Sequence, residues 1–364
     1  YKGISILGMP LVALLLVYTF FQGTVIDGAN ASRWIKVPFI GVTFQTSSLA
    51  MIVLMVYVAR YLAKVENKEY TFKSSFIELW IPVFIILALI LPANFSTAAL
   101  IFSMVCMLVF VGGYPLRFLG TIIGMGIVFL ALFIGLAKTF KDAMPNRVDT
   151  WMGRIERFTS DAPNEDDYQI EKAKIAIATG QIYGVGPGKS VQKNFLPQSS
   201  SDFIFAIIVE EYGIIGGLTV MFLYLMLFFR FLVHANKSKS LFGKLIIVGL
   251  GFPIIFQALI NMGVATELLP VTGQPLPLIS SGGSSVWMTC ISIGIIISVT
   301  KKEEEIAQEE EEKLEREAIL QQLIDEHIQR EKNKEEAEAL GLEPQVADYS
   351  IEDKANPMRA VMGK

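Results

Sequence analysis

Eight apolar runs dominate this chain, and about 20 apolar residues is the length that crosses a hydrocarbon core of ~30 Å. Inside a bilayer such a run must be a helix, because a helix satisfies its own backbone hydrogen bonds there. The sequence therefore predicts an all-α, polytopic membrane protein. The expected transmembrane spans are residues 3–22, 44–63, 78–93, 95–112, 118–137, 203–233, 245–264 and 286–300.

The charged residues, 18% of the chain, gather mostly in one central loop and in the C-terminal tail. Short loops rich in Lys and Arg follow the second and sixth spans, and two lysines end the eighth, so the positive-inside rule places these loops in the cytoplasm. The opposite face then carries the long extracytoplasmic loop 138–202 and the uncharged segment 270–285. Both ends are expected to be cytoplasmic. Because the chain starts almost directly at a span, we expect it to be N-terminally truncated.

Few side chains are available for nucleophilic or metal chemistry. Both cysteines, Cys106 and Cys290, lie inside spans, and no Cys or His spacing matches a metal site. The two histidines, His234 and His327, lie in a short cytoplasmic loop and in the tail. Acid–base chemistry on the outer face is therefore expected from carboxylates. Nothing in the chain, whose net charge is −4, indicates a nucleic-acid partner.

The tail divides the chain into a transmembrane domain, residues 1–302, and a charged segment, residues 303–364. Interleaved Glu and Lys or Arg over 303–341 predict an exposed helix, and the end is expected to be disordered. A solvated helix is one interpretation. A weak coiled coil or partner-binding arm is the other.

Within the long loop, Trp151 and Arg154 are spaced so that they share one face of a helix. An aromatic ring beside a guanidinium could hold a phosphate or a sugar at the headgroup level. The same pair could equally be an interfacial anchor. Residues 168–180 predict an amphipathic helix that ends at Gly180.

A glycine-rich turn, Gly184-Val-Gly-Pro-Gly188, follows this helix and is in turn followed by Lys189 and Lys193. Glycines allow a backbone path that exposes successive N–H groups to an anion. The spacing is not that of an ATP-binding Walker motif. On the outer face, the pyrophosphate of a lipid headgroup fits better than a nucleotide.

Three carboxylates lie at or inside the sixth span. Asp202 directly precedes it and could be a helix N-cap or a catalytic base. Glu210 and Glu211 lie two turns in, where a charge is costly and marks either a function or a structural ion pair. Together with Asn261 they are the candidates for an intramembrane polar site.

Residues 270–285 contain three prolines and three glycines and cannot be a regular helix. A re-entrant or interfacial loop is expected. Its hydroxyls, including those of Ser281 and Ser284, could contact a sugar or a phosphate. A rigid plug between spans is the alternative.

Several of these segments match one family in order. The matching segments are 28–35, 44–47, Trp151 with Arg154, 168–169, 184–188, 190–193 (Ser-Val-Gln-Lys), 196–197, 201–206 (Ser-Asp-Phe-Ile-Phe-Ala), Gln257 with Asn261, and 276–285. Over residues 1–302 the chain resembles the SEDS family (shape, elongation, division and sporulation), and the Ser-Val-Gln-Lys segment favours the division branch.

The resemblance implies a fold of ten spans, of which the first two are missing here. It implies a peptidoglycan glycosyltransferase in the cytoplasmic membrane, at the division septum, that polymerises lipid II on the outer face. The implied partners are a class B penicillin-binding protein and other divisome proteins. The chain departs from the family pattern at three positions, Ser48, Met51 and Asn94.

In the expected reaction, Asp202 is the general base, and Arg154, Lys189 and Lys193 hold the pyrophosphate. Further contacts to substrate are expected from Trp151, Gln192, Ser281 and Ser284. No carboxylate cluster indicates a metal site, although a divalent cation such as Mg²⁺ or Mn²⁺ could assist. A lipid II flippase and a non-catalytic scaffold that recruits a transpeptidase are the alternatives.

Overall fold

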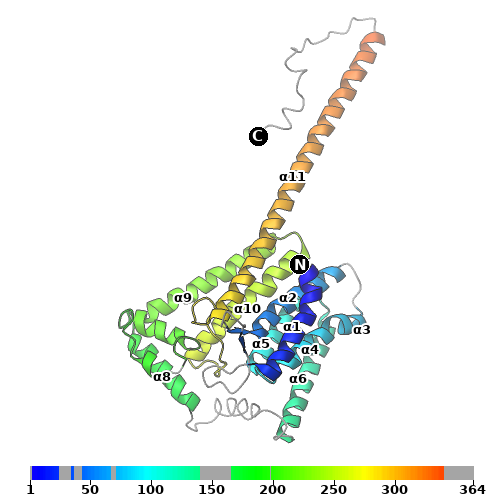
Figure 1. The fold of residues 1–364 in the computed structure, drawn as a ribbon. Helices are drawn as coiled ribbons and strands as arrows, with labels where there is room; N and C mark the ends of the chain where they lie inside the picture. Colours follow the sequence, from blue (N-terminus) through cyan, green and yellow to red (C-terminus); the bar gives the residue numbers. More distant parts are fainter. Residues whose placement is uncertain are drawn as a thin grey trace. The chain divides into compact units, whose positions relative to one another are not determined.

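The computed structural model describes residues 2–23, 34–36, 43–66, 71–139, 165–196 and 198–339. Most of them are helical, and helices α1 to α10 form one bundle (Figure 1). The only strands in these ranges, β1 (Trp34–Lys36) and β2 (Thr43–Gln45), form a short antiparallel hairpin. The helices are α1 (Lys2–Gln22), α2 (Thr46–Val65), α3 (Phe72–Ser75), the π-turn η1 (Phe76–Trp80), α4 (Ile81–Ile90), α5 (Phe95–Val111), α6 (Leu116–Thr139), α8 (Glu165–Gly180), the 3₁₀ turn η2 (Gln192–Asn194), α9 (Ile204–Lys237), α10 (Leu241–Ala265) and α11 (Gly283–Ala339).

Each of the eight expected spans falls on a helix, so the prediction of a polytopic helical membrane protein is confirmed. Within the described residues, five helices are long and apolar enough to cross a membrane: Thr46–Val65, Phe72–Ile90, Ile204–Lys237, Leu241–Ala265 and Gly283–Asn333. Three shorter apolar helices coincide with the other expected spans: Leu7–Gln22, Phe95–Val111 and Leu116–Leu132. The hairpin of β1 and β2 was not predicted.

The third span starts at Phe72, earlier than the expected residue 78, and contains a π-turn. Pro82 stands at the start of α4 and has no N–H to donate to the carbonyl of Glu78 one turn before it. The hydroxyl of Tyr57 on α2 donates to that carbonyl instead. A missing backbone donor thus accounts for the wider turn and is compensated by a neighbouring helix.

Helix α10 lies at the centre of the bundle. In the most apolar 18-residue stretch of α10, 72% of the residues are buried, whereas in the corresponding stretch of α9 only 17% are buried. Much of α9 is therefore left to face lipid. Two glycines let α10 approach its neighbours closely. A Cβ at Gly249 would lie 2.9 Å from the side chain of Leu108, and one at Gly251 would lie 2.6 Å from the ring of Phe231.

Helix α9 is broken at Gly213, where φ is 70° and ψ is −174°. The chain after α8 fills the break: Gln181 accepts from the N–H of Ile214 at 2.8 Å, and Val185 donates to the carbonyl of Glu210 at 2.9 Å. Residues 214–237 alone extend about 36 Å, enough to cross a bilayer. Glu210 therefore lies on a short helical piece ahead of the spanning part, rather than within one uniform span.

Helix α8 ends at Gly180, as predicted, and packs along α9 (Figure 1). Helix α11 runs without a break from the last expected span into the charged tail. The chain divides into two compact units, Tyr1–Thr300 and Lys301–Lys364. The second unit contains i,i+4 ion pairs such as Lys301 with Glu305, at 3.7 Å.

Candidate active site around Asp202

Asp202 lies in a turn that leads directly into α9. Its backbone N–H donates to the carbonyl of Gln198 at 3.1 Å. The N-cap residue of α9 is Phe203, so Asp202 stands one position before the cap. The side chain is half-buried, an environment in which a carboxylate can still be reached by a substrate.

Helix α10 and the segment 266–282 bind this turn through side-chain hydrogen bonds. The side-chain amide of Asn261 donates to the carbonyl of Asp202 at 2.7 Å and to that of Gln274 at 2.8 Å. The hydroxyl of Ser280 donates to the carbonyl of Ser201 at 2.5 Å. Asn261 is thus the side chain that joins Asp202 to the centre of the bundle.

Gly273 lies beside the carboxylate of Asp202. A Cβ at Gly273, where φ is +65°, would lie 3.5 Å from Oδ2 of Asp202. The carboxylate therefore packs against the backbone of segment 266–282. That backbone continues directly into Gln274 and Pro275, which line a cavity in the bundle.

This cavity lies between α2, α5, α10, α11 and segment 266–282. Its wall is fixed by two amides: Gln274 donates to the hydroxyl of Thr97 at 2.9 Å, and Gln257 donates to the carbonyl of Pro275 at 3.2 Å. None of the lining side chains is charged, and Ser48 and Met51 are among them. Hydroxyl and amide groups of this kind suit the uncharged polar groups of a sugar.

The glycine-rich turn forms a second part of the site. Gly184, Gly186 and Gly188 all have positive φ, of 77°, 106° and 75°, a conformation that L side chains rarely adopt. Lys189 is exposed, and the ammonium group of Lys193 donates to the carbonyl of Gly188 at 2.7 Å. The turn therefore presents two cations.

Glu210 holds the glycine-rich turn and the two lysines after it, residues 184–193 (the cationic turn), in place. Its carboxylate accepts from the hydroxyl of Ser190 and from the backbone N–H groups of Val191, at 3.1 Å, and Gln192, at 3.3 Å. Within the described part of the chain it forms no ion pair with an arginine. Glu211 accepts from the N–H of Ser190 at 3.4 Å.

The structure thus brings the expected site residues into two groups on α9. Asp202 and Asn261 lie at the start of the helix. Glu210 and Glu211 lie about 12 Å further along it by helical rise, and Lys189, Gln192 and Lys193 belong to the loop that Glu210 contacts. Ser281 donates its N–H to the carbonyl of Ser200 at 2.8 Å, and Ser284 is buried.

Trp151 and Arg154 lie outside the described residues. Within those residues no group of three or more His, Cys, Asp or Glu side chains is arranged to hold a metal ion. The roles of Ser190 and Gly273 were not predicted. Ser190 belonged to a recognised segment, but nothing in the segment indicates which carboxylate its hydroxyl would contact.

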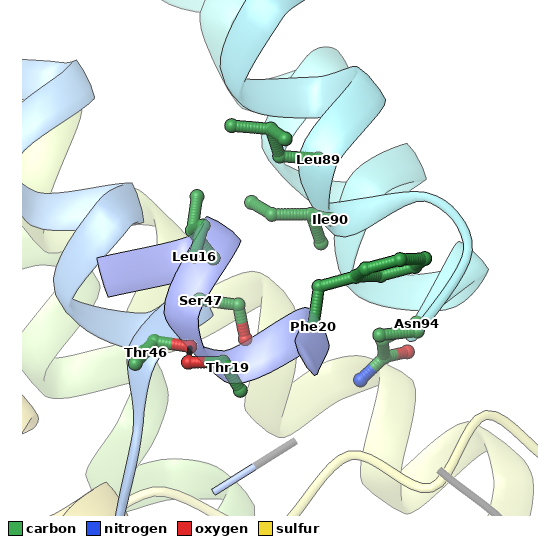
Figure 2. A pocket seen from close by; sticks show the side chains of 9 residues that line it. Leu16, Thr19, Phe20, Thr46, Ser47, Leu89, Ile90 and Asn94 are labelled. Carbon is green, nitrogen blue, oxygen red and sulfur yellow. Dashed lines mark hydrogen bonds between the residues drawn. The ribbon is translucent and has the colours of Figure 1, made fainter. Parts of the chain in front are cut away.

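A second cavity lies between α1, α2, α4 and the turn before α5. Its lining is mostly apolar, with Leu16, Phe20 and Leu89 on its walls and Asn94 at one end (Figure 2). The side chain of Asn94 accepts from the N–H of Thr97 at 3.2 Å and so caps α5. Asn and Asp are about equally good N-caps, which explains why Asn is suited to this position.

Comparison with known proteins agrees with this architecture. Residues 1–305 match the cell cycle protein family FtsW/RodA/SpoVE. The chain belongs to this family. The resemblance to SEDS proteins that the sequence motifs indicated is therefore confirmed.

Curated relatives cover most of the chain. A protein of Saccharophagus degradans named "Probable peptidoglycan glycosyltransferase FtsW" is 34% identical over 322 residues, which cover 82% of this chain and 79% of the relative. A protein of the same name from Geobacter metallireducens is 33% identical over 291 residues, covering 79% and 75%.

Two solved structures share the fold. One is a chain from a peptidoglycan synthase complex, with a TM-score of 0.62 and 24% identity, covering 83% of this chain and 82% of that one. The other is the rod shape determining protein RodA of Thermus thermophilus, with a TM-score of 0.57 and 24% identity, covering 83% and 79%.

Proposed function

We propose that this chain is a peptidoglycan glycosyltransferase that polymerises lipid II into glycan strands during cell division. The observation that carries the proposal is the placement of Asp202. It is a half-buried carboxylate held by Asn261, and it lies beside the segment that lines an uncharged polar cavity. The names of the relatives support the same reaction class.

In the proposed reaction Asp202 is the general base. The attacking sugar hydroxyl gives its proton to the Asp202 carboxylate while its oxygen bonds to the anomeric carbon of the donor sugar. The bond from that carbon to the lipid pyrophosphate breaks, and the pyrophosphate leaves with the bonding electrons. Lys189 and Lys193, with Arg154 from the same loop, stabilise the charge that develops on it.

The location follows from the reaction. The chain lies in the cytoplasmic membrane at the division septum, with the site on the outer face, where lipid II presents its sugars. A class B penicillin-binding protein crosslinks the product, and other divisome proteins assemble with the pair. A fold shared with a chain from a peptidoglycan synthase complex is consistent with such a partner.

The test is polymerisation of supplied lipid II by the purified full-length protein, with and without its transpeptidase. Asp202→Asn removes the base but keeps the shape, and it is expected to lower turnover on the order of 10²-fold or more. Glu267→Gln is the matched control, because Glu267 lies on the neighbouring segment and pairs with Lys174 at 2.5 Å. It is expected to stay within a few-fold of the unaltered protein.

Other outcomes identify the alternatives. Turnover of Asp202→Asn near that of the unaltered protein would remove Asp202 from catalysis. Movement of lipid II across the bilayer without polymer would favour a flippase. Neither activity, with the transpeptidase still recruited, would favour a scaffold.

A further inference from the structure

Glu210 is fully buried, and all of its side-chain partners in the described residues belong to the cationic turn. One carboxylate oxygen accepts from the hydroxyl of Ser190, and the other accepts from the N–H of Val191. The N–H of Gln192 reaches both oxygens at 3.3 Å. The hydroxyl oxygen of Ser190 also accepts from the N–H of Lys193 at 3.1 Å. Glu210 and Ser190 together therefore satisfy three successive backbone donors.

A buried carboxylate is costly unless several donors satisfy it. A side chain within the turn could satisfy the same N–H groups without burying a charge. What a local cap cannot do is join the turn to another element. Glu210 does so, because it projects from α9 and its partners lie 18 to 20 residues earlier in the chain.

The start of the turn is joined to α9 through the backbone. Val185 and Gly186 donate to the carbonyls of Glu210 and Glu211, at 2.9 and 3.0 Å. No Cβ fits at Gly184, where it would lie 2.2 Å from the Glu211 carbonyl oxygen. The turn is thus fixed at 184–186 by backbone contacts and at 190–193 by Glu210.

Lys189 lies between these two attachments, and Lys193 lies at the second. The N–H of Lys189 donates to Gly186 at 3.1 Å, and the ammonium group of Lys193 bonds back to Gly188. The backbone that carries both cations is therefore held in one conformation. Since α9 begins at Ile204, two residues after Asp202, the same helix sets the separation between the carboxylate and the two cations.

We propose that Glu210, through Ser190, is a positioning residue that holds Lys189 and Lys193 for the pyrophosphate of the substrate. This inference rests on the proposed function. Glu210 does not touch substrate. It keeps the cations in place while charge develops on the leaving group, so its loss acts through them.

The experiment compares three serine variants of the full-length protein. Ser190→Ala removes the hydroxyl between Glu210 and Lys193, and Ser190→Thr retains it. Ser199→Ala is the matched control, because Ser199 belongs to the same loop and donates to the carbonyl of Lys193 at 3.1 Å without contacting Glu210.

The first measurement is amide hydrogen exchange over residues 189–193, which needs no substrate. Ser190→Ala is expected to accelerate exchange there, whereas Ser199→Ala leaves it unchanged. Unchanged exchange in Ser190→Ala would overturn the attachment. The second measurement is lipid II polymerisation, in which Ser190→Ala is expected to lower kcat/KM roughly tenfold. Ser190→Thr is expected to recover most of that loss.

A double-mutant cycle separates positioning from a general structural effect. In a Lys189→Ala, Lys193→Ala background, Ser190→Ala is expected to have little further effect on the residual rate. A loss as large as in the unaltered background would show that Ser190 does not act through the lysines. Normal polymerisation by Ser190→Ala despite faster exchange would also overturn the inference. If the unaltered protein makes no polymer, the proposed function fails and this inference fails with it, whereas the exchange result stands.

Discussion

Replacing Asn261 with alanine tests how Asp202 is held. Asn261 is 1% exposed, and its side-chain amide donates to the carbonyls of Asp202 and Gln274 at 2.7 and 2.8 Å. Its own oxygen has no hydrogen-bond partner among the described residues. The substitution therefore removes two hydrogen bonds, and both of them run to the segments that form the site.

The expected loss of stability follows from these two carbonyls. A buried polar group left without a partner costs about 1–3 kcal/mol. Gln274 is buried, so its carbonyl bears most of that cost, whereas half-buried Asp202 regains part of it from water. We therefore expect Asn261→Ala to lower the free energy of unfolding by about 2–4 kcal/mol. A displacement of Asp202 by ~1 Å can reduce turnover about 10²-fold.

Gln257→Ala is the matched control. Gln257 lies one turn earlier on α10, and its side-chain amide donates to the carbonyl of Pro275 at 3.2 Å, the residue that follows Gln274. Its loss should cost about 1 kcal/mol and affect turnover less. The assays are the thermal midpoint of the purified protein and lipid II polymerisation at a temperature where every variant is folded.

Two results would refute this reasoning. Normal turnover of a destabilised Asn261→Ala protein would show that Asp202 keeps its position without the amide. Equal losses in Asn261→Ala and Gln257→Ala would show that segment 266–282 responds as a whole, with no specific role for the bond to Asp202.

Three further predictions concern the fold and its orientation. Gly213→Ala should destabilise the protein by ~2 kcal/mol or more, because its Cβ would lie 2.1 Å from the Ile182 carbonyl oxygen. Gly294→Ala is the control, because a Cβ there would meet open space. Equal thermal midpoints of the two variants would contradict the close contact at Gly213. With both native cysteines removed, Ser200→Cys should react with an impermeant thiol reagent on intact cells and Ser238→Cys only with a permeant one; the reverse pattern would invert the orientation. Truncation after Lys302 should leave polymerisation within a few-fold, since the positive-inside rule predicts a cytoplasmic tail and the proposed reaction takes place on the outer face. Complete loss in a correctly inserted protein would contradict this.

The sequence by itself determined the membrane spans. The length and polarity of an apolar run decide whether it can cross a bilayer, and both properties are local. Local chemistry also indicated the end of α8 at Gly180. The family was recognisable because its motifs are short, ordered segments that can be read without knowing which of them touch.

Only the tertiary structure decided how the site is assembled. Asp202 accepts a hydrogen bond from Asn261, 59 residues away, and Gln274 donates one to Thr97, 177 residues away. The sequence interpreted Glu210 as a charge inside a span, because a hydrophobic window cannot reveal that α9 breaks at Gly213 and that an earlier turn fills the break. Such contacts depend on where the packed helices place each backbone donor and acceptor, and no local pattern of residues records that placement.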